Sequence, residues 1–129
     1  MIFVDSNAFI AIRNKRHPLH KKAVFISTQI SDPLITTNIV IAETLSVLSM
    51  RVNKATAIQF GEEVDKLNIQ IVQIDQQFHF KAWEIFKKIR SKNVSFFDCT
   101  SFAVMEKLGI KTVFSFDADF KKYGFELLT

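Results

Sequence analysis

The stretch Ile2-Phe3-Val4-Asp5-Ser6-Asn7 places three apolar residues directly before three short polar ones. A short apolar run that ends in residues typical of helix N-caps predicts a buried strand leading straight into a helix. The apolar residues Phe9, Ile10 and Ile12 then follow with helical spacing. A strand joined to a helix in this way predicts an α/β fold.

The same alternation continues along the chain. Further strands are predicted at Leu34–Thr36, Ile69–Ile74, Lys111–Ser115 and Phe125–Leu128. Helices are predicted from Pro18 to Ile30, Val40 to Val52, Ala55 to Leu67, Asp75 (as N-cap) to Ile89, and Phe96 to Leu108, with Gly109 closing the last one. Strands alternating with helices predict a parallel sheet covered on both faces, in which ligands bind beyond the carboxyl ends of the strands.

Length and composition fit a single domain over residues 1–129. The chain is 48% hydrophobic and 23% charged, which is ordinary for a globular protein and argues against disorder. Only 3 Gly and 2 Pro are present, which argues against an all-β sandwich or barrel. The net charge of +4 favours an anionic partner such as RNA or DNA.

The single cysteine, Cys99, cannot form an internal disulfide, which favours a reducing compartment and a small buried residue. The apolar N-terminus has no basic residue ahead of it and contains Asp5, unlike a secretory signal. No apolar run approaches the roughly 20 residues of a membrane span. We therefore expect a cytoplasmic protein that does not interact with membranes.

Four acidic residues are expected at one edge of the sheet. Asp5 follows the first strand and Asp117 follows the fourth. Glu43 lies one turn into the helix after the second strand, and Asp98 starts the helix that leads to the fourth. Each of them sits in an otherwise apolar stretch, where a solvated charge is not expected.

Such a cluster predicts a metal-dependent hydrolase. Carboxylates at close range raise one another's pKa values, and a divalent cation relieves the repulsion. Mg²⁺ or Mn²⁺ prefers oxygen ligands and keeps several waters, so substrate phosphate can complete its shell. It can also lower the pKa of a bound water and neutralise charge on a phosphoryl group. An acid-rich site with few histidines suits phosphodiester hydrolysis.

Each acid also has a purely structural explanation. Asp5 and Asp98 could simply cap helices, which is worth about 1 kcal/mol. Glu43 could be an ordinary helix residue. Asp117 and Asp119 could be turn residues, and for Asp119 this is the favoured interpretation. The joint placement of the acids, rather than any one of them, favours a site.

The chain resembles the PIN-domain ribonucleases, and within them the VapC toxins of bacterial and archaeal toxin–antitoxin pairs, over essentially its whole length. The similarity is carried by the opening stretch 2–7, Ile41-Ala42-Glu43, Ser95-Phe96-Phe97-Asp98-Cys99, the stretch 114–120, and Gly124-Phe125. The resemblance implies a three-layer α/β/α sandwich with a central parallel sheet of four to five strands.

The resemblance also implies roles for residues. Asp5, Glu43, Asp98 and Asp117 would be the catalytic acids that bind Mg²⁺ or Mn²⁺, with Glu43 completing the site or orienting the attacking water. Ser6 and Ser115 match small hydroxyl residues that support the acids, and Ser115 stands where Thr is more usual. Asp119 matches an accessory acid.

The implied activity is that of an endoribonuclease that leaves a 3′-hydroxyl and a 5′-phosphate. Members of the family usually form homodimers and are neutralised by a small antitoxin that blocks the site. We therefore expect an RNA substrate, a cognate antitoxin and a second copy of the chain as partners.

Several other features are set aside or kept as secondary hypotheses. His17 and His20 are expected to be exposed helix residues, and His79 has no metal-binding partner in the sequence. Trp83, Tyr123 and the 14 Phe are expected mostly in the core, with one or two at an interface. The basic run 13–16 follows Asp5 closely and could rim the site, so Arg13, Lys15 and Arg16 are candidate RNA contacts.

Two other functions are alternatives to the nuclease. Phosphoryl transfer to an aspartate, as in haloacid dehalogenase-like phosphatases, needs a second Asp two residues after the first, where this chain has Asn7. Response regulators need paired acids there. A non-catalytic RNA-binding or scaffold protein of the same fold is the remaining alternative, and it predicts binding that chelators do not affect.

Overall fold

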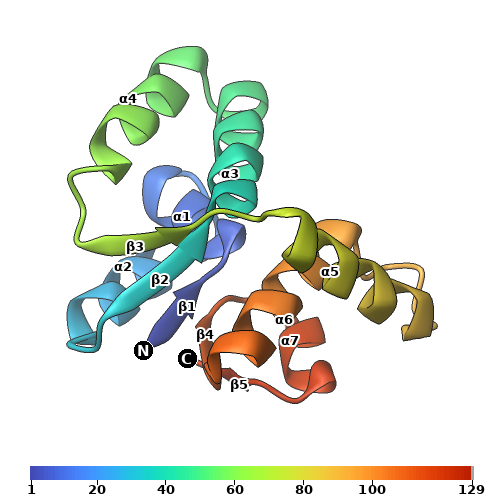
Figure 1. Ribbon diagram of the computed structural model, residues 1–129. Coiled ribbons are helices and arrows are strands. Elements are labelled where there is room, and N and C mark those ends of the chain that lie inside the picture. Colours follow the sequence, from blue (N-terminus) through green and yellow to red (C-terminus); the bar gives the residue numbers. More distant parts are fainter. Residues whose placement is uncertain (129) are drawn as a thin grey trace.

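The computed structural model describes residues 1–128 and contains a central parallel sheet flanked by helices (Figure 1). Its strands are β1 (Ile2–Val4), β2 (Leu34–Thr37), β3 (Ile69–Val72), β4 (Thr112–Phe114) and β5 (Glu126–Leu127). They pair in the order β3-β2-β1-β4-β5, and every pair is parallel. The predicted fold class is therefore confirmed.

The helices within the described residues are α1 (Ser6–Arg13), α2 (His20–Gln29), α3 (Asn38–Arg51), α4 (Lys54–Val64), α5 (Gln76–Lys88), α6 (Phe96–Leu108) and α7 (Ala118–Tyr123). They form two groups. In the first, α1 packs against α2 and α3, and α3 packs against α4. In the second, α5 packs against α6. The contact of α3 with α6 joins the two groups.

Strand β1 is the centre of the fold. Its three residues are buried, and it pairs with β2 on one side and with β4 on the other. The buried Thr36 hydroxyl donates to the Val4 carbonyl oxygen at 2.7 Å. The chain first builds the sheet outward from β1 to β3 and then crosses to β4 on the opposite side. In parallel sheets this reversal leaves a crevice beyond the strand ends, here beyond β1 and β4.

Several helix ends form as predicted. The Asp75 carboxylate accepts from the Phe78 amide at 3.0 Å, as an N-cap does. Gly109 follows α6 with a φ of 68°, the left-handed conformation that glycine adopts most readily. Cys99 is fully buried, and burial raises the pKa of its thiol to about 11, which confirms the prediction of a core residue.

The connection between α1 and α2 differs from the prediction. The helix α2 begins at His20 rather than at Pro18. His17 Nδ1 accepts from the Leu19 amide at 3.0 Å, and His20 Nδ1 lies 2.8 Å from the Ala11 carbonyl oxygen. The expectation that both histidines are exposed was wrong, because these contacts hold them half-buried in the turn.

Helix α7 was not predicted. The sequence favours a turn at Asp119, whereas residues from Ala118 to Tyr123 form a short helix with Asp117 as N-cap. An isolated helix of this length would be unstable, so packing must stabilise it. Its buried Phe120 meets Phe102 edge-on with centroids 5.1 Å apart, and the Tyr123 ring stacks on Phe102 at 4.4 Å.

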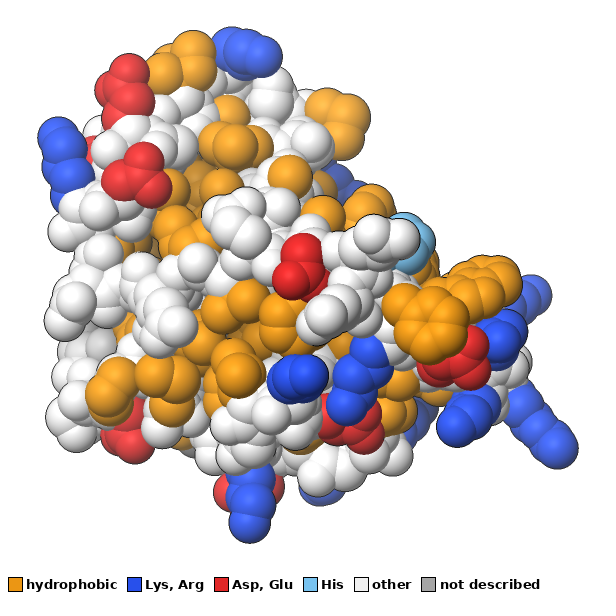
Figure 2. Space-filling view, viewed as in Figure 1, with side chains coloured by type: hydrophobic (Ala, Val, Ile, Leu, Met, Phe, Trp, Pro, Cys, Tyr) orange, Lys and Arg blue, Asp and Glu red, His pale blue; other side chains and the backbone are white. Residues whose placement is uncertain are grey.

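The aromatic residues of α5 also depart from the expectation that most aromatics lie in the core. The side chains of Phe80, Trp83 and Phe86 are 63%, 47% and 39% exposed. Figure 2 shows this group as a patch of apolar side chains over α5, bordered by lysine and arginine. Within residues 1–128, no helix has both the length and the apolar character that crossing a bilayer requires.

We predict that Phe102→Ala lowers the free energy of unfolding by about 3–5 kcal/mol, because it opens a cavity beneath α7 and removes the aromatic contacts that hold it. Urea denaturation followed by circular dichroism measures this. The matched control is Phe25→Ala, whose ring is 65% exposed and whose loss should change stability by less than about 0.5 kcal/mol. Equal effects for the two variants would contradict this account of α7.

Candidate active site

Asp5 lies where β1 ends and α1 begins, and only 5% of it is exposed. Its backbone N–H donates to the Phe114 carbonyl oxygen at 3.1 Å, which ties it to the end of β4. Asp5 occupies the N-cap position of α1. Within the described residues Ser6–Arg13, however, no backbone amide of the helix makes a capping hydrogen bond with the Asp5 carboxylate. The carboxylate accepts instead from the Ser115 hydroxyl at 3.0 Å. Capping therefore does not explain this buried acid.

Asn7 connects the two strand ends and was missed as a site residue from the sequence. Its side-chain oxygen accepts from the Phe116 amide at 3.0 Å and lies 3.2 Å from the Ser115 hydroxyl. That hydroxyl also accepts from the Asp117 amide at 3.1 Å. The one sequence feature that indicated a role for Asn7 was its position at a helix start, two residues after Asp5. Together these bonds fix the loop that carries Asp117.

Asp98 stands in the first turn of α6 and forms a capping box with Ser95. The Ser95 amide donates to Asp98 Oδ2, and the Asp98 amide donates to the Ser95 hydroxyl, both at 3.1 Å. The prediction of a capping role was thus correct in part. The capping bond uses Oδ2, so the same carboxylate can present Oδ1 to a neighbouring group.

Asp117 and Asp119 meet Asp98 on the far side of the crevice. One oxygen from each of these three carboxylates lies within 4.8 Å of the other two. Asp117 Oδ1 accepts from the Asp119 amide at 2.9 Å, which caps α7. Asp119 is therefore a helix residue rather than a turn residue. Among the described residues, this is the group of His, Cys, Asp and Glu close enough to hold a cation.

Glu43 approaches from the other group of helices. It is half-buried on α3, the helix that contacts α6. The charge of Glu43 raises the pKa values of both Asp5 and Asp98, so it lies close enough to repel them. The structure brings Asp98 and Asp117 together with Asp119, the expected accessory acid, while Asp5 and Glu43 lie outside that group and interact with it electrostatically.

The two serines support Asp5 in different ways. The buried Ser115 uses its hydroxyl, and the resulting hydrogen bond lowers the pKa of Asp5. Ser6 is also buried, and the polar backbone of Ser6, next to the Asp5 carboxylate, lowers the pKa of Asp5.

The raised pKa values of two acids in the site show that their ionised forms are destabilised. Burial, and next the charge of Asp98, raise the pKa of Asp5 from an ordinary 3.8 to about 7. Burial also raises the pKa of Asp98 to about 6, with added repulsion from Asp117 and Glu43, and the Ser95 hydrogen bonds oppose the rise. Both acids hold protons more tightly than an ordinary aspartate, and a nearby cation would favour their ionised forms.

The candidate RNA contacts lie at the opposite end of α1 from Asp5. Arg13 donates to Glu63 Oε2 at 2.6 Å, and its guanidinium lies over the Phe60 ring, 5.4 Å from the centroid. Lys15 and Arg16 follow it and are exposed. The eight-residue helix separates them from Asp5 by about 12 Å, so they do not rim the carboxylates.

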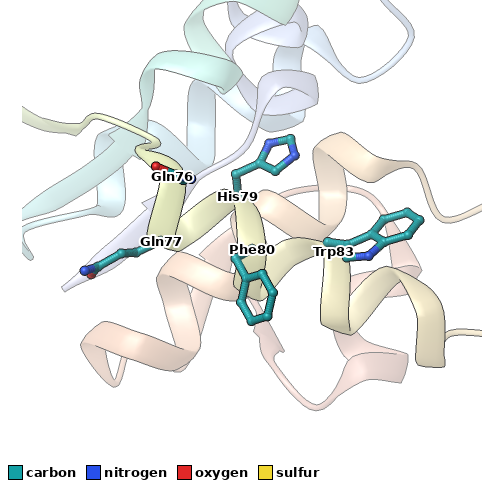
Figure 3. A pocket seen from close by; sticks show the side chains of 5 residues that line it. All are labelled: Gln76, Gln77, His79, Phe80 and Trp83. Atoms are coloured by element: carbon teal, nitrogen blue, oxygen red, sulfur yellow. The ribbon is translucent and has the colours of Figure 1, made fainter.

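A separate hollow lies on α5. Gln76, Gln77, His79, Phe80 and Trp83 line it, and Figure 3 shows all five projecting from that helix. Within residues 1–128 its lining includes none of the clustered carboxylates. The hollow is largely apolar and belongs to the aromatic patch rather than to the catalytic crevice.

The comparisons with known proteins agree with this geometry. The PIN domain family profile matches residues 2–126, and the chain belongs to that family. More narrowly, it is a VapC-like homologue within that family of nucleases. It is 30% identical over 125 residues to the 23S rRNA-specific endonuclease VapC20 of Mycobacterium tuberculosis, covering 97% of this chain and 95% of the relative.

The similarity extends to solved structures. The crystal structure of M. tuberculosis VapC20, a sarcin–ricin loop cleaving toxin, superposes with a TM-score of 0.92 at 29% identity, covering 97% of this chain and 96% of that one. FitAcB from Neisseria gonorrhoeae has a TM-score of 0.72 at 16% identity, covering 100% and 97%, and supports the fold alone.

The raised pKa values predict how stability depends on pH. Asp5 and Asp98 bind protons more tightly in the folded than in the unfolded chain, so their contribution is complete below about pH 4 and is lost as the pH rises through about 7. In EDTA, the free energy of unfolding should therefore fall between pH 5 and pH 8.

The variant Asp5→Asn keeps an acceptor for Ser115 and removes the charge. We expect it to be about 2–4 kcal/mol more stable than the parent at pH 8, with the gain shrinking towards pH 4. Urea titrations at several pH values measure this. A gain that does not vary with pH would rule out ionisation of Asp5 as the cause.

Proposed function

We propose that this chain is a Mg²⁺- or Mn²⁺-dependent endoribonuclease that hydrolyses phosphodiester bonds at the crevice between the ends of β1 and β4. The observation that carries this proposal is the convergence of Asp98, Asp117 and Asp119 oxygens within 4.8 Å, beside the buried Asp5. Four separate elements supply these acids and Glu43. Structural needs alone do not explain so many carboxylates in one place.

The donor set fits a hard divalent cation. The clustered ligands are all carboxylate oxygens, which Mg²⁺ and Mn²⁺ prefer. The raised pKa values of Asp5 and Asp98 reflect burial first and repulsion between the acids second. We assign Asp5, Asp98 and Asp117 to cation binding, with Asp119 as an accessory ligand. The cation would supply charge neutralisation at the phosphoryl group and a more acidic water.

The other residues of the site position these acids. Ser115 directs the Asp5 carboxylate, Asn7 holds the loop that bears Asp117, and Ser95 fixes the orientation of Asp98. Glu43, which stands across the crevice on α3, would accept a hydrogen bond from the attacking water and orient it. Catalysis of this type depends on such preset positions more than on covalent chemistry.

We further infer that the substrate is a structured RNA of the kind that VapC20 is named for, and that the protein acts in the cytoplasm as the toxin of a toxin–antitoxin pair. Coverage of nearly the full length of VapC20 supports this inference. A cognate antitoxin would neutralise the enzyme by covering the carboxylates. A short neighbouring reading frame that encodes a binding partner would support the pairing.

The first test is cleavage of total cellular RNA by the purified protein, with the 5′ ends mapped. We expect discrete cuts in Mg²⁺ or Mn²⁺ that EDTA abolishes. Asp98→Asn should reduce the rate by at least about 100-fold, because it removes a charge on which the cation depends.

The matched control for this test is Asp32→Asn, an exposed acid before β2 that should cleave like the parent. Metal-independent cuts, or full activity of Asp98→Asn, would refute the assignment. RNA binding that is unaffected by EDTA and by loss of the acids, without any cleavage, would favour the non-catalytic alternative.

We also propose that two copies pair through the aromatic patch of α5, formed by Phe80, Trp83 and Phe86. Trp83 and Phe86 stack with centroids 6.0 Å apart, which gives the patch a firm apolar surface. The lysines beside it are partly neutralised, since Lys87 pairs with Glu84 at 2.9 Å and Lys81 with Glu106 at 3.7 Å. An apolar patch with balanced charge suits a second copy of itself.

Light scattering after size exclusion tests the pairing. The parent should elute as a dimer, and Phe80→Ser with Trp83→Ser should convert it to a monomer without loss of helical content. The control is Phe25→Ser, an exposed aromatic on α2 that lies outside the patch. A parent that is monomeric at high concentration, or a double variant that stays dimeric, would exclude this interface.

A further inference from the structure

A basic groove lies at the far end of α1 and α3 from the carboxylates. It has a volume of about 740 Å³ and lies between the connection after α1 and the junction of α3 with α4. Its charged and amide side chains include Arg13, Asn14, Lys15, Arg16, Arg51 and Asn53. As far as residues 1–128 show, no acidic residue lines it.

The positive charge of this basic groove is only partly neutralised. Arg13 is paired with Glu63 at 2.6 Å. None of the ion pairs found among residues 1–128 involves Lys15, Arg16 or Arg51. The groove therefore presents three cationic side chains to an incoming ligand, next to a fourth that Glu63 and the Phe60 ring hold in place.

Helix capping explains only part of this arrangement. Arg13 and Arg51 lie in the last turns of α1 and α3, where a cation complements the helix dipole. Lys15 and Arg16 lie beyond α1 and serve no helix end. The groove also receives the start of α4, where Asn53 accepts from the Thr56 amide at 2.7 Å and the dipole favours an anion.

The basic groove and the carboxylates are linked by two helices that run side by side. Asp5 directly precedes α1 and Arg13 ends it, while Glu43 and Arg51 lie on α3. In each pair the separation is eight residues, or about 12 Å along the helix. This distance is on the order of a few nucleotides along a strand.

We propose that the basic groove binds phosphates of the RNA strand a few nucleotides from the bond that is cut. The inference rests on the proposed nuclease function and adds the place where the substrate backbone is held. Arginine and lysine contacts to phosphate set the register of a strand without reading its sequence. The groove would thus position the RNA, while the shape of the crevice selects the bond.

Binding is measured in Asp98→Asn protein, which is expected not to cut. The probe is a fluorescein-labelled RNA hairpin with the sarcin–ricin loop sequence, followed by anisotropy from about 50 to 200 mM salt. Adding Arg16→Gln and Arg51→Gln should weaken binding by about tenfold near 0.1 M salt. Loss of two phosphate contacts should lower the slope of log K against log salt by about 1.4 to 1.8.

The matched control is Lys107→Gln with Lys111→Gln, which removes two exposed positive charges flanking Gly109, away from the basic groove. It should leave the affinity nearly unchanged. In protein with Asp98 intact, the groove pair should raise KM and spare kcat, whereas a misfolded site would lower kcat. Thermal melting confirms that both double variants fold.

Two outcomes would overturn the proposal. In the first, the groove variant binds the hairpin like its parent, and a simultaneous loss of affinity for a polyglutamate peptide would assign the groove to an acidic protein segment. In the second, the control pair weakens RNA binding as much as the groove pair does, so that only the net charge of the protein matters. Metal-dependent cleavage that needs Asp98 would stand in every case, so this failure is distinct from failure of the nuclease.

Discussion

The parallel pairing of β1 with β4 is the constraint on which the rest of the structure depends. The register sets Val4 opposite Phe114, so the two strands end together and deliver Asp5 and Ser115 to the same point. The hydroxyl of Ser115 joins them across 110 residues of sequence. Because β1 is buried between two neighbours, a slip of one residue would disrupt both the core and the site.

The acids cluster because the topology forces them to, and hydrogen bonds to neutral groups make the clustering tolerable. Ser115, Asn7 and Ser95 are uncharged, so they orient carboxylates without neutralising them. An arginine in their place would relieve the repulsion permanently and leave little affinity for a cation. The negative charge of the clustered carboxylates therefore remains uncompensated, and this charge favours binding of a positive ion.

Much of this arrangement follows from the sequence, because strand ends and helix starts have local patterns. The strand–helix alternation, the caps at Asp75 and Gly109, and the edge that collects the acids were all predictable. Helix α7 was not, because its stability comes from Phe102, a residue distant in sequence. The role of Asn7 was missed for a similar reason, since its partner Phe116 lies in the loop after β4, far away in sequence. Contacts of that kind become visible only when the chain is folded.

The order of the strands has a consequence for biosynthesis. The ribosome produces β2 and β3 between β1 and its neighbour β4, so β1 lacks that neighbour until both have been made. Asp98 lies 93 residues after Asp5 and Asp117 lies 112 residues after it, and synthesis proceeds at about 5–20 residues per second. The ribosome is itself built of RNA, and the carboxylate cluster cannot assemble on the growing chain before Asp98 and Asp117 have been made. The strand order thus postpones assembly of the site during synthesis.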